Sequence, residues 1–395
     1  MKKFLFVCFL LGSVLFFGCE NSVNSAKMAS VEDENGSDKE EPKKDEADTS
    51  DSTDPGDSAA DSGADPAGDE EPADDTDSDS GDTVDDGGET DTGNETVCDP
   101  TYDPVFCYGQ YYVKTTEVLS GDNGAPRKFK IFEPIDAQGN IPVIHFLHGY
   151  QLKYDYYDNL LMQLCSHGFI VVASQSNHNV IGGDDSFEEA EKIAEFMEWL
   201  KTGLQNYVTV TPDFGNVGVA GHNRGGKVTN RFLNSNPAAA KSFFGVDPTD
   251  VDVDFATADD PRSLSAPVQF IGESMFLGVE KRKSLVELSR AESLCAFEDD
   301  DSAKFYAAYP SPSHHIVAAG VGRTDMLDIG ECGTTCTLAC STSGDDGMNT
   351  MFITYTAGLM TAFFNSTLKG QTEYEELLND PSGAYPFTAT LVDHK

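Results

Sequence analysis

Short apolar runs alternate with longer amphipathic stretches along the chain from residue 98 onward. Runs rich in Val, Ile and Phe are typical of buried strands, and apolar residues three or four positions apart are typical of helices. The predicted strands are Lys128–Phe132, Val143–Leu147, Phe169–Ala173, Val217–Ala220, Phe243–Val246, Val268–Ile271 and His315–Ala319. The predicted helices are Asp155–Ser166, Phe187–Leu204, Gly225–Leu233, Lys281–Leu294 and Asn349–Leu368. Because the two kinds of element alternate, we predict an α/β fold with a mostly parallel sheet and helices on both faces.

Residues 1–19 have a different pattern, that of a secretory signal peptide. Two lysines precede an apolar stretch, Phe4–Phe17, which is too short to span a bilayer but has the length of a signal-peptide core. Gly18 and Cys19 then resemble a bacterial lipobox, in which the cysteine is acylated, although Phe16 and Phe17 depart from its usual residues. We predict an exported protein, lipid-anchored through Cys19 to the bacterial cell envelope, at the outer membrane or cell surface. An ordinary signal peptide with a chance cysteine is the alternative.

Residues 20–97 contain 28 Asp and Glu against four Lys, with Ser, Thr, Gly and Pro making up most of the remainder. Without apolar periodicity, such a segment cannot offset the entropy lost on ordering, so we predict an acidic disordered linker. As a flexible coil it would reach roughly 50 Å. Residues 98–395 form the predicted folded domain. This domain has 20 Lys and Arg against 40 Asp and Glu, within a net charge of −42 for the whole chain. Such an acidic surface repels phosphate backbones, so we expect no nucleic acid partner.

The cysteines support export, and no metal or other cofactor is predicted. Cys165 lies on the apolar face of a predicted helix and is expected to remain a buried thiol. Six others beyond Cys19 could form three disulfides in 15 ways; they are Cys98, Cys107, Cys295, Cys332, Cys336 and Cys340. The short loop between Cys98 and Cys107 favours that pair. The spacing of the last three matches no common zinc site, and the aspartates at 250, 252 and 254 lack the glycine and glutamate of a calcium loop.

The segment Gly221-His222-Asn223-Arg224-Gly225 has the spacing of a nucleophile elbow, with a predicted strand before it and a predicted helix after it. So sharp a turn needs small flanking residues and usually forces its central residue to a positive φ, which asparagine tolerates. An asparagine amide, however, is not a nucleophile near neutral pH. The sequence therefore predicts the turn without the group that performs the chemistry.

From about Lys128 to the C-terminal region the chain resembles the chlorophyllase family. The segments that carry the resemblance are Pro142–Tyr150, Ser166–Ala173, Gly221–Lys227 and His315–Asp328. The resemblance implies an α/β-hydrolase fold and hydrolysis of a carboxylic ester by a serine, an aspartate and a histidine. It also implies that the backbone N–H groups of Tyr150 and Arg224 form an oxyanion hole, which needs no particular side chain.

Two of the implied triad positions differ from the family. Asn223 stands in place of the serine and Arg323 in place of the histidine, whereas Asp247 is retained within Gly-Val-Asp-Pro. Arginine stays protonated at ordinary pH and cannot act as a general base. We expect Arg323 to donate instead to the Asp247 carboxylate and to the side-chain oxygen of Asn223. A surface-loop arginine is the alternative.

These observations favour a non-catalytic binder, a pseudo-hydrolase whose ligand is a hydrophobic ester or carboxylate bound above the carboxyl edge of the sheet. The alternative is an active carboxylic-ester hydrolase with a rearranged site, and a third class is a display or spacer protein without a small ligand. Weaker candidates for a relocated site are His314, His315, Ser311 and Ser313, and Trp199 is expected in the core.

Overall fold

A computed structural model describes residues 98–176, 185–250, 268–281, 301–331, 340 and 342–395. The predicted signal peptide, the lipidation site at Cys19 and the acidic linker lie outside these residues. Within the described residues, no helix is both long enough and apolar enough to cross a membrane.

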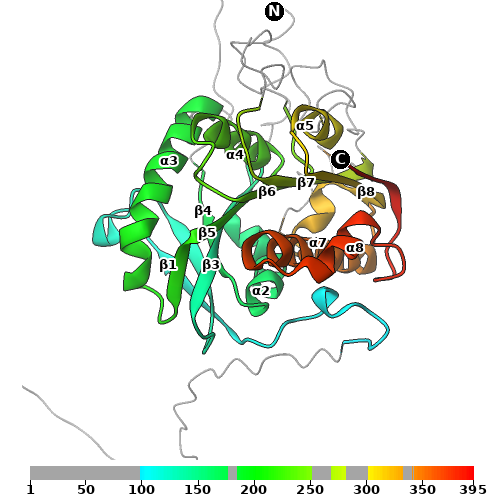
Figure 1. The fold of residues 1–395 in the computed structure, drawn as a ribbon, viewed down its shortest axis with the longest axis horizontal. Helices are drawn as coiled ribbons and strands as arrows, with labels where there is room; N and C mark the ends of the chain where they lie inside the picture. Colours follow the sequence, from blue (N-terminus) through cyan, green and yellow to red (C-terminus); the bar gives the residue numbers. More distant parts are fainter. Residues whose placement is uncertain (1–97, 177–184, 251–267, 282–300, 332–339, 341) are drawn as a thin grey trace, which may run out of the picture. The chain divides into compact units, whose positions relative to one another are not determined.

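The described residues build a nine-stranded sheet in the order β1-β2-β4-β3-β5-β6-β7-β8-β9 (Figure 1). The strands are β1 (Val113–Val118), β2 (Phe129–Pro134), β3 (Asn140–Leu147), β4 (Ile170–Ser174), β5 (Thr211–His222), β6 (Ser242–Val246), β7 (Glu273–Lys281), β8 (Ser313–Gly322) and β9 (Ala389–His394). From β4 to β8 neighbouring strands are parallel, while β1, β2 and β9 pair antiparallel. The carboxyl ends of the parallel strands therefore share one edge of the sheet.

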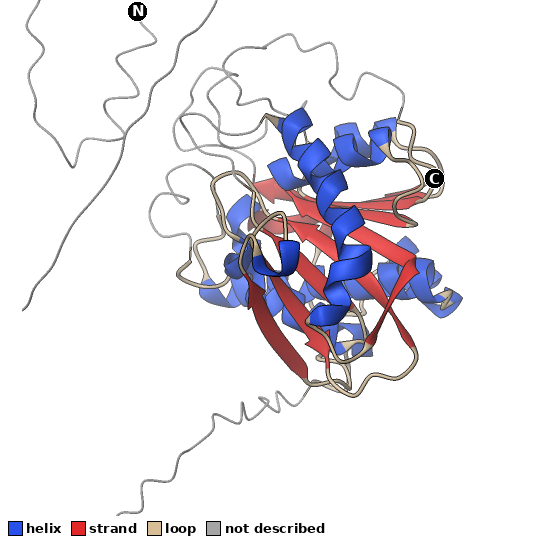
Figure 2. Cartoon of the chain, turned by 90° about the vertical axis from the view of Figure 1, so that its left-hand side faces the viewer, coloured by secondary structure: helices blue, strands red, loops and turns tan. Residues whose placement is uncertain are grey.

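Helices cover both faces of this sheet, as Figure 2 shows. One face packs against α2 (Asp158–Ser166) and α7 (Asp346–Lys369), and the other against α3 (Ser186–Gly203), α4 (Arg224–Ser235) and α5 (Ser302–Ala308). Along β3, Ile144 and Phe146 belong to the first core, and Val143 and Leu147 to the second. Such alternation is what a strand buried on both faces requires. The predicted α/β class is confirmed.

Local capping accounts for where the long helices begin and end. The Asp185 carboxylate accepts the N–H groups of Phe187 and Glu188 at the start of α3, and Asp345 accepts the N–H of Met348 at the start of α7. At the other end of α7, Gly370 takes a left-handed conformation with φ 67°. A short helix, α8 (Glu375–Asn379), follows.

The predicted strands and helices agree with the described elements, with one wrong strand and one helix only partly described. Val268–Ile271 is not a strand, because the pairing with β6 and β8 begins at Glu273, and Ile271 is 80 % exposed. Lys281 ends β7, so the predicted helix Lys281–Leu294 does not begin there, and its remainder lies outside the described residues. The sequence patterns missed β1, β7, β9, α5 and α8.

The favoured disulfide, Cys98–Cys107, is present, and Cys165 is a buried free thiol, as predicted. Cys340 is also disulfide-bonded. Trp199 packs at the margin of the second core, against Phe129 and Phe196.

Candidate active site

The sharp turn predicted at Asn223 joins β5 to α4. Asn223 is its central residue and has φ 52° and ψ −120°, a conformation that few non-glycine residues adopt. A Cβ on Gly225 would lie 2.2 Å from the Leu147 carbonyl oxygen, and one on Gly221 would lie 2.5 Å from Gly225. The flanking glycines are therefore required by close backbone contacts, as the elbow spacing predicts.

The turn lies at the carboxyl edge of the sheet, together with three further residues predicted for the site. Tyr150 follows β3, Asp247 follows β6 and Arg323 follows β8. Asp247 also has a positive φ, 38°, and its N–H donates to the Leu277 carbonyl oxygen at 2.5 Å. The parallel order of the strands thus brings together residues far apart in the sequence.

Arg323 and Asp247 form a buried ion pair. Arg323 Nε donates to Asp247 Oδ2 at 2.6 Å, and both side chains are almost completely excluded from solvent. The predicted contact between these two residues is confirmed, and the alternative of a surface-loop arginine is wrong. In a buried setting each partner would be costly without the other.

The side-chain oxygen of Asn223 accepts a hydrogen bond from the backbone N–H of Tyr150 at 3.2 Å. The prediction that Arg323 donates to this oxygen is wrong, since the Nε of Arg323 is aligned with a charged acceptor, Asp247, which forms a stronger hydrogen bond than a neutral amide. Arg224 begins α4, and its guanidinium lies 3.4 Å from Ser176 Oγ. The Asn223 amide therefore blocks one of the two backbone donors predicted for an oxyanion hole.

Three buried polar atoms at this site make no hydrogen bond within the described residues: Asn223 Nδ2, Asp247 Oδ1 and Arg323 Nη1. Two are donors and one is an acceptor. Buried polar atoms are usually paired, so this set has unused capacity for a polar ligand group.

Tyr157 and His222 form a buried hydrogen-bonded pair that holds the turn before Tyr150 in place. No sequence pattern had indicated this role. Tyr157 Oη and His222 Nδ1 lie 2.6 Å apart, and the Gly149 N–H donates to Tyr157 Oη at 3.2 Å. Burial, together with the charge of Arg323, lowers the pKa of His222 well below its usual value, and burial raises the pKa of Tyr157. Both groups are therefore neutral, and the phenol donates to Nδ1 while fixing the turn that carries Tyr150.

His148, which precedes Gly149 in the same turn, holds this turn against the residues that follow β4. Its Nε2 accepts the N–H of Ser176 at 2.8 Å, and burial lowers its pKa to about 4. A neutral imidazole that accepts a backbone hydrogen bond is a structural group here. His148 therefore does not replace the missing histidine.

Two of the weaker sequence candidates, His315 and Ser313, make hydrogen bonds with buried serines. His315 Nε2 lies 3.0 Å from Ser302 Oγ in the protein interior, and Ser313 Oγ lies 3.0 Å from Ser274 Oγ. Asp250, the first of the three aspartates considered for calcium, is ion-paired with Lys227 and Lys304. Among the described residues, no group of three His, Cys, Asp or Glu side chains is placed to hold a metal ion.

A mostly parallel sheet, helices on both of its faces and a sharp strand-to-helix turn after β5 define an α/β-hydrolase fold. The sequence model of the chlorophyllase family matches residues 101–394, and the chain belongs to that family. Chlorophyllase-1, chloroplastic, of Citrus unshiu is 30 % identical over 298 residues, which cover 71 % of this chain and 86 % of that protein. Chlorophyllase-2 of Arabidopsis thaliana is 28 % identical over 223 residues, covering 54 % and 69 %. Chlorophyllase-1 of the same plant is 26 % identical over 309 residues, covering 72 % and 92 %.

Proposed function

We propose that this protein is a pseudo-hydrolase, a chlorophyllase-like domain that binds a hydrophobic ester or carboxylate without cleaving it. The observation that carries the proposal is the pairing of Arg323 with Asp247 beside an asparagine at the elbow. In a hydrolase of this fold, the aspartate orients a histidine that removes a proton from the elbow serine. Here the aspartate holds a permanent cation and the elbow residue has no hydroxyl, so neither proton transfer nor acyl transfer is available.

The polar atoms of the site support a binding role. The Nδ2 of Asn223 and the Nη1 of Arg323 are donors without an acceptor among the described residues. Both would suit a carbonyl or carboxylate oxygen, and a charged donor strengthens such a bond. A rotation of the Asn223 side chain would release the Tyr150 N–H, which could then donate to the same oxygen.

The alternative function, an active hydrolase with a rearranged site, needs a serine that a histidine activates. Two such pairs occur among the described residues: Ser174 with His145 at 2.8 Å and Ser302 with His315 at 3.0 Å. All four side chains are buried, and burial lowers the pKa of His145 to about 3. Neither serine stands at a strand-to-helix turn that would present it to a substrate. These observations favour the binder.

An esterase assay of the purified full chain tests this choice. With p-nitrophenyl acetate and butyrate, we expect hydrolysis at the level of buffer or of an unrelated protein, because nucleophile and base are both missing. Turnover on the order of 1 s⁻¹, within the ordinary enzymatic range, would contradict the proposal if Asn223→Gly, which tolerates the positive φ of the turn, or Arg323→Lys, which keeps a cation for Asp247, abolished it. Loss of that turnover in Ser302→Ala instead would identify the rearranged hydrolase.

A thermal-shift screen of long-chain esters and carboxylates distinguishes a binder from a spacer protein. Because a ligand that binds only the folded state stabilises it, we expect at least one compound to raise the melting temperature of the wild type. The shift should shrink in Arg323→Lys, which keeps a cation for Asp247 but loses the planar guanidinium. No shift with any compound would favour the spacer.

We further propose that Cys19 is acylated and anchors the protein to a bacterial cell envelope. The support is the short apolar stretch before Gly18-Cys19 and the acidic linker after it. Metabolic labelling with an alkyne fatty acid in the native host should tag the wild type, while Cys19→Ser should be unlabelled and should leave the membrane fraction. Cys8→Ser, within the apolar stretch, is the matched control and should remain labelled. An unlabelled wild type would contradict acylation.

A further inference from the structure

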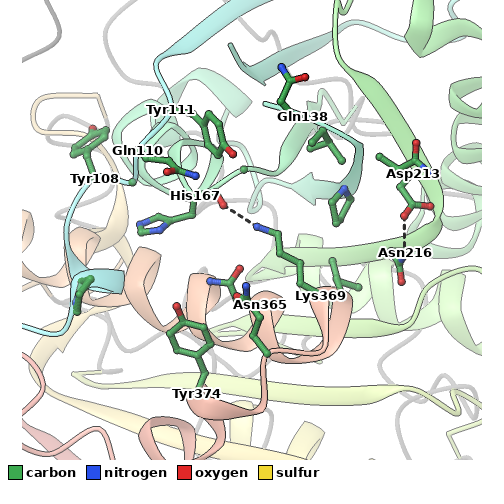
Figure 3. A pocket seen from close by; sticks show the side chains of 18 residues that line it. Tyr108, Gln110, Tyr111, Gln138, His167, Asp213, Asn216, Asn365, Lys369 and Tyr374 are labelled. Atoms are coloured by element: carbon green, nitrogen blue, oxygen red, sulfur yellow. Dashed lines mark hydrogen bonds between the residues drawn. The ribbon is translucent and has the colours of Figure 1, made fainter. Parts of the chain in front are cut away.

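A cavity of about 900 Å³ lies at the amino ends of β3, β4 and β5, at the edge of the sheet opposite to Asn223. Five parts of the chain line it: the segment from Pro104 to Tyr111, the start of β3, the turn before β4, the start of β5, and the C-terminal end of α7 with the residues after it. Figure 3 shows the labelled side chains arranged around this space. A volume of this size falls in the range of ligand pockets.

The cavity is far from the candidate active site, and the length of α7 shows how far, because this helix begins near one site and ends at the other. Near the start of this helix, Asn349 donates to the Asp325 and Leu327 carbonyl oxygens beside Arg323. At its end, Lys369 lines the cavity. The twenty residues between them span roughly 30 Å at the helical rise of 1.5 Å per residue. A ligand in the cavity is therefore separate from one bound at Asn223.

Most side chains around the cavity are neutral, polar and planar. Six carry amides: Gln110, Gln138, Asn140, Asn216, Asn365 and Gln371. Three are tyrosines: Tyr108, Tyr111 and Tyr374. An amide offers a donor and an acceptor side by side, and a tyrosine combines an apolar ring face with a hydroxyl. Such a lining matches a ligand with many hydroxyl groups and some C–H surface.

The charged side chains of the cavity are already engaged with the protein. Lys369 Nζ donates to the His167 carbonyl oxygen at 2.7 Å and lies 3.8 Å from the centre of the Phe169 ring, and burial lowers its pKa to about 8. Asp213 accepts the Gly215 N–H at 2.9 Å and the Asn216 amide at 2.7 Å. One cation and one carboxylate, each bound locally, provide no excess charge for an ionic ligand.

His167 adds no cation. Its Nε2 lies 2.8 Å from the Cys107 carbonyl oxygen, and burial lowers its pKa. The ring is therefore neutral near pH 7, with Nε2–H as the donor and Nδ1 as an acceptor. The net charge of the whole chain, −42, also disfavours anions.

The wall that carries Tyr108 is held in place by several bonds. The Cys98–Cys107 disulfide closes it on one side, and the N–H groups of Gly109 and Tyr111 donate to Ser166 at 2.7 and 3.1 Å. Gly109 has no room for a side chain, since a Cβ there would lie 2.3 Å from the Ser166 carbonyl oxygen. A preformed wall costs a ligand little ordering entropy.

We propose that this cavity binds a neutral, polyhydroxylated ligand of the chemical class of an oligosaccharide. The amides pair with neighbouring hydroxyl groups, each giving and accepting one hydrogen bond. The tyrosine rings pack against the C–H face of a sugar ring and release water from both surfaces. The site is independent of the pseudo-hydrolase proposal, because it uses none of the residues at the carboxyl edge.

Calorimetric titration of the full chain with maltotetraose, cellotetraose and chitotetraose tests this site. We expect at least one sugar to bind with a Kd in the micromolar to millimolar range. Tyr108→Ala and Gln138→Ala should each weaken binding at least fivefold, because both side chains line the cavity and both are exposed, so their removal leaves the core intact. Tyr112→Ala is the matched control, since Tyr112 is 75 % exposed and lies outside the lining, and it should bind like the wild type.

Three results would overturn the proposal. The first is no heat of binding with any of the three sugars. The second is binding that Tyr108→Ala and Gln138→Ala leave unchanged, which would place the sugar elsewhere. The third is tighter binding of tetragalacturonate or inorganic phosphate than of the neutral sugars, which would indicate an anion site around Lys369.

Discussion

Replacing Asn223 with serine and Arg323 with histidine in the same protein is expected to produce a measurable esterase. The serine would supply the nucleophile, and the histidine would sit beside Asp247, which already bonds to the side chain at position 323 at 2.6 Å. The serine would also free the Tyr150 N–H, which the Asn223 amide oxygen now occupies. Against p-nitrophenyl butyrate we expect a rate on the order of 10² times that of the wild type or more, the usual contribution of a positioned base.

Each single replacement is expected to stay at the wild-type level. A serine without a base keeps its proton, and a histidine without a serine has nothing to activate. The gain should therefore be strongly non-additive. Adding Asp247→Asn to the double variant is the control, and it should remove most of the new activity because the imidazole loses its orienting carboxylate. A double variant that unfolds like the wild type yet cleaves no ester from acetate to dodecanoate would contradict the assignment of these positions.

Removing one member of the Arg323–Asp247 pair is expected to give the largest loss of stability. In Arg323→Met the Asp247 carboxylate, fully excluded from solvent, would lose the cation with which it pairs, and such losses cost about 3–5 kcal/mol of unfolding free energy. The double variant Asp247→Asn with Arg323→Met should recover part of this loss, because a neutral amide leaves no buried charge and asparagine tolerates the positive φ of position 247. Urea unfolding of the wild type, the single variant and the double variant measures both effects.

The exposed pair of Lys201 and Glu198, also 2.6 Å apart, provides the matched control. Lys201→Met should change the free energy of unfolding by about 0.5 kcal/mol or less, because water solvates the remaining carboxylate. If Arg323→Met costs no more than Lys201→Met, the buried pair does not hold the site together.

Most of the central strands could be predicted from the sequence because they are buried on both faces, so their apolar runs carry the signal, and β7 is the exception. The edge strands could not. β1 and β9 are largely exposed, and their sequences have the polar composition of loops. Only their pairing with β2 and β8 makes them strands. The apolar run Val268–Ile271 has the composition of a strand, but the neighbouring strands fix the register from Glu273 onward. Local composition does not determine which of two nearby segments will pair.

The sequence predicted those parts of the candidate active site that belong to a recognisable local motif. The elbow spacing predicted the positive φ of Asn223, and the residues after β6 and β8 followed from the family resemblance. The partner of the Asn223 amide did not follow, because the choice between Arg323 and the Tyr150 N–H depends on side-chain direction in three dimensions. The cavity at the opposite edge could not be predicted either, since its lining comes from separated segments with no shared motif.

The Cys98–Cys107 disulfide determines how the domain carries mechanical load. A pull on the chain ahead of Cys98 passes through the sulfur bridge directly to Cys107, so residues 99–106 bear no tension. Val105 and Phe106, buried in the core against α7, are therefore not drawn out of it by force on the N-terminus. The force reaches the folded part at Gly109 and Tyr111, where bonds to Ser166 resist it. In the reduced protein the same pull would act first on the contacts of Tyr102 with Tyr385 and of Asp103 with Ala384, and then draw Val105 and Phe106 out of the core.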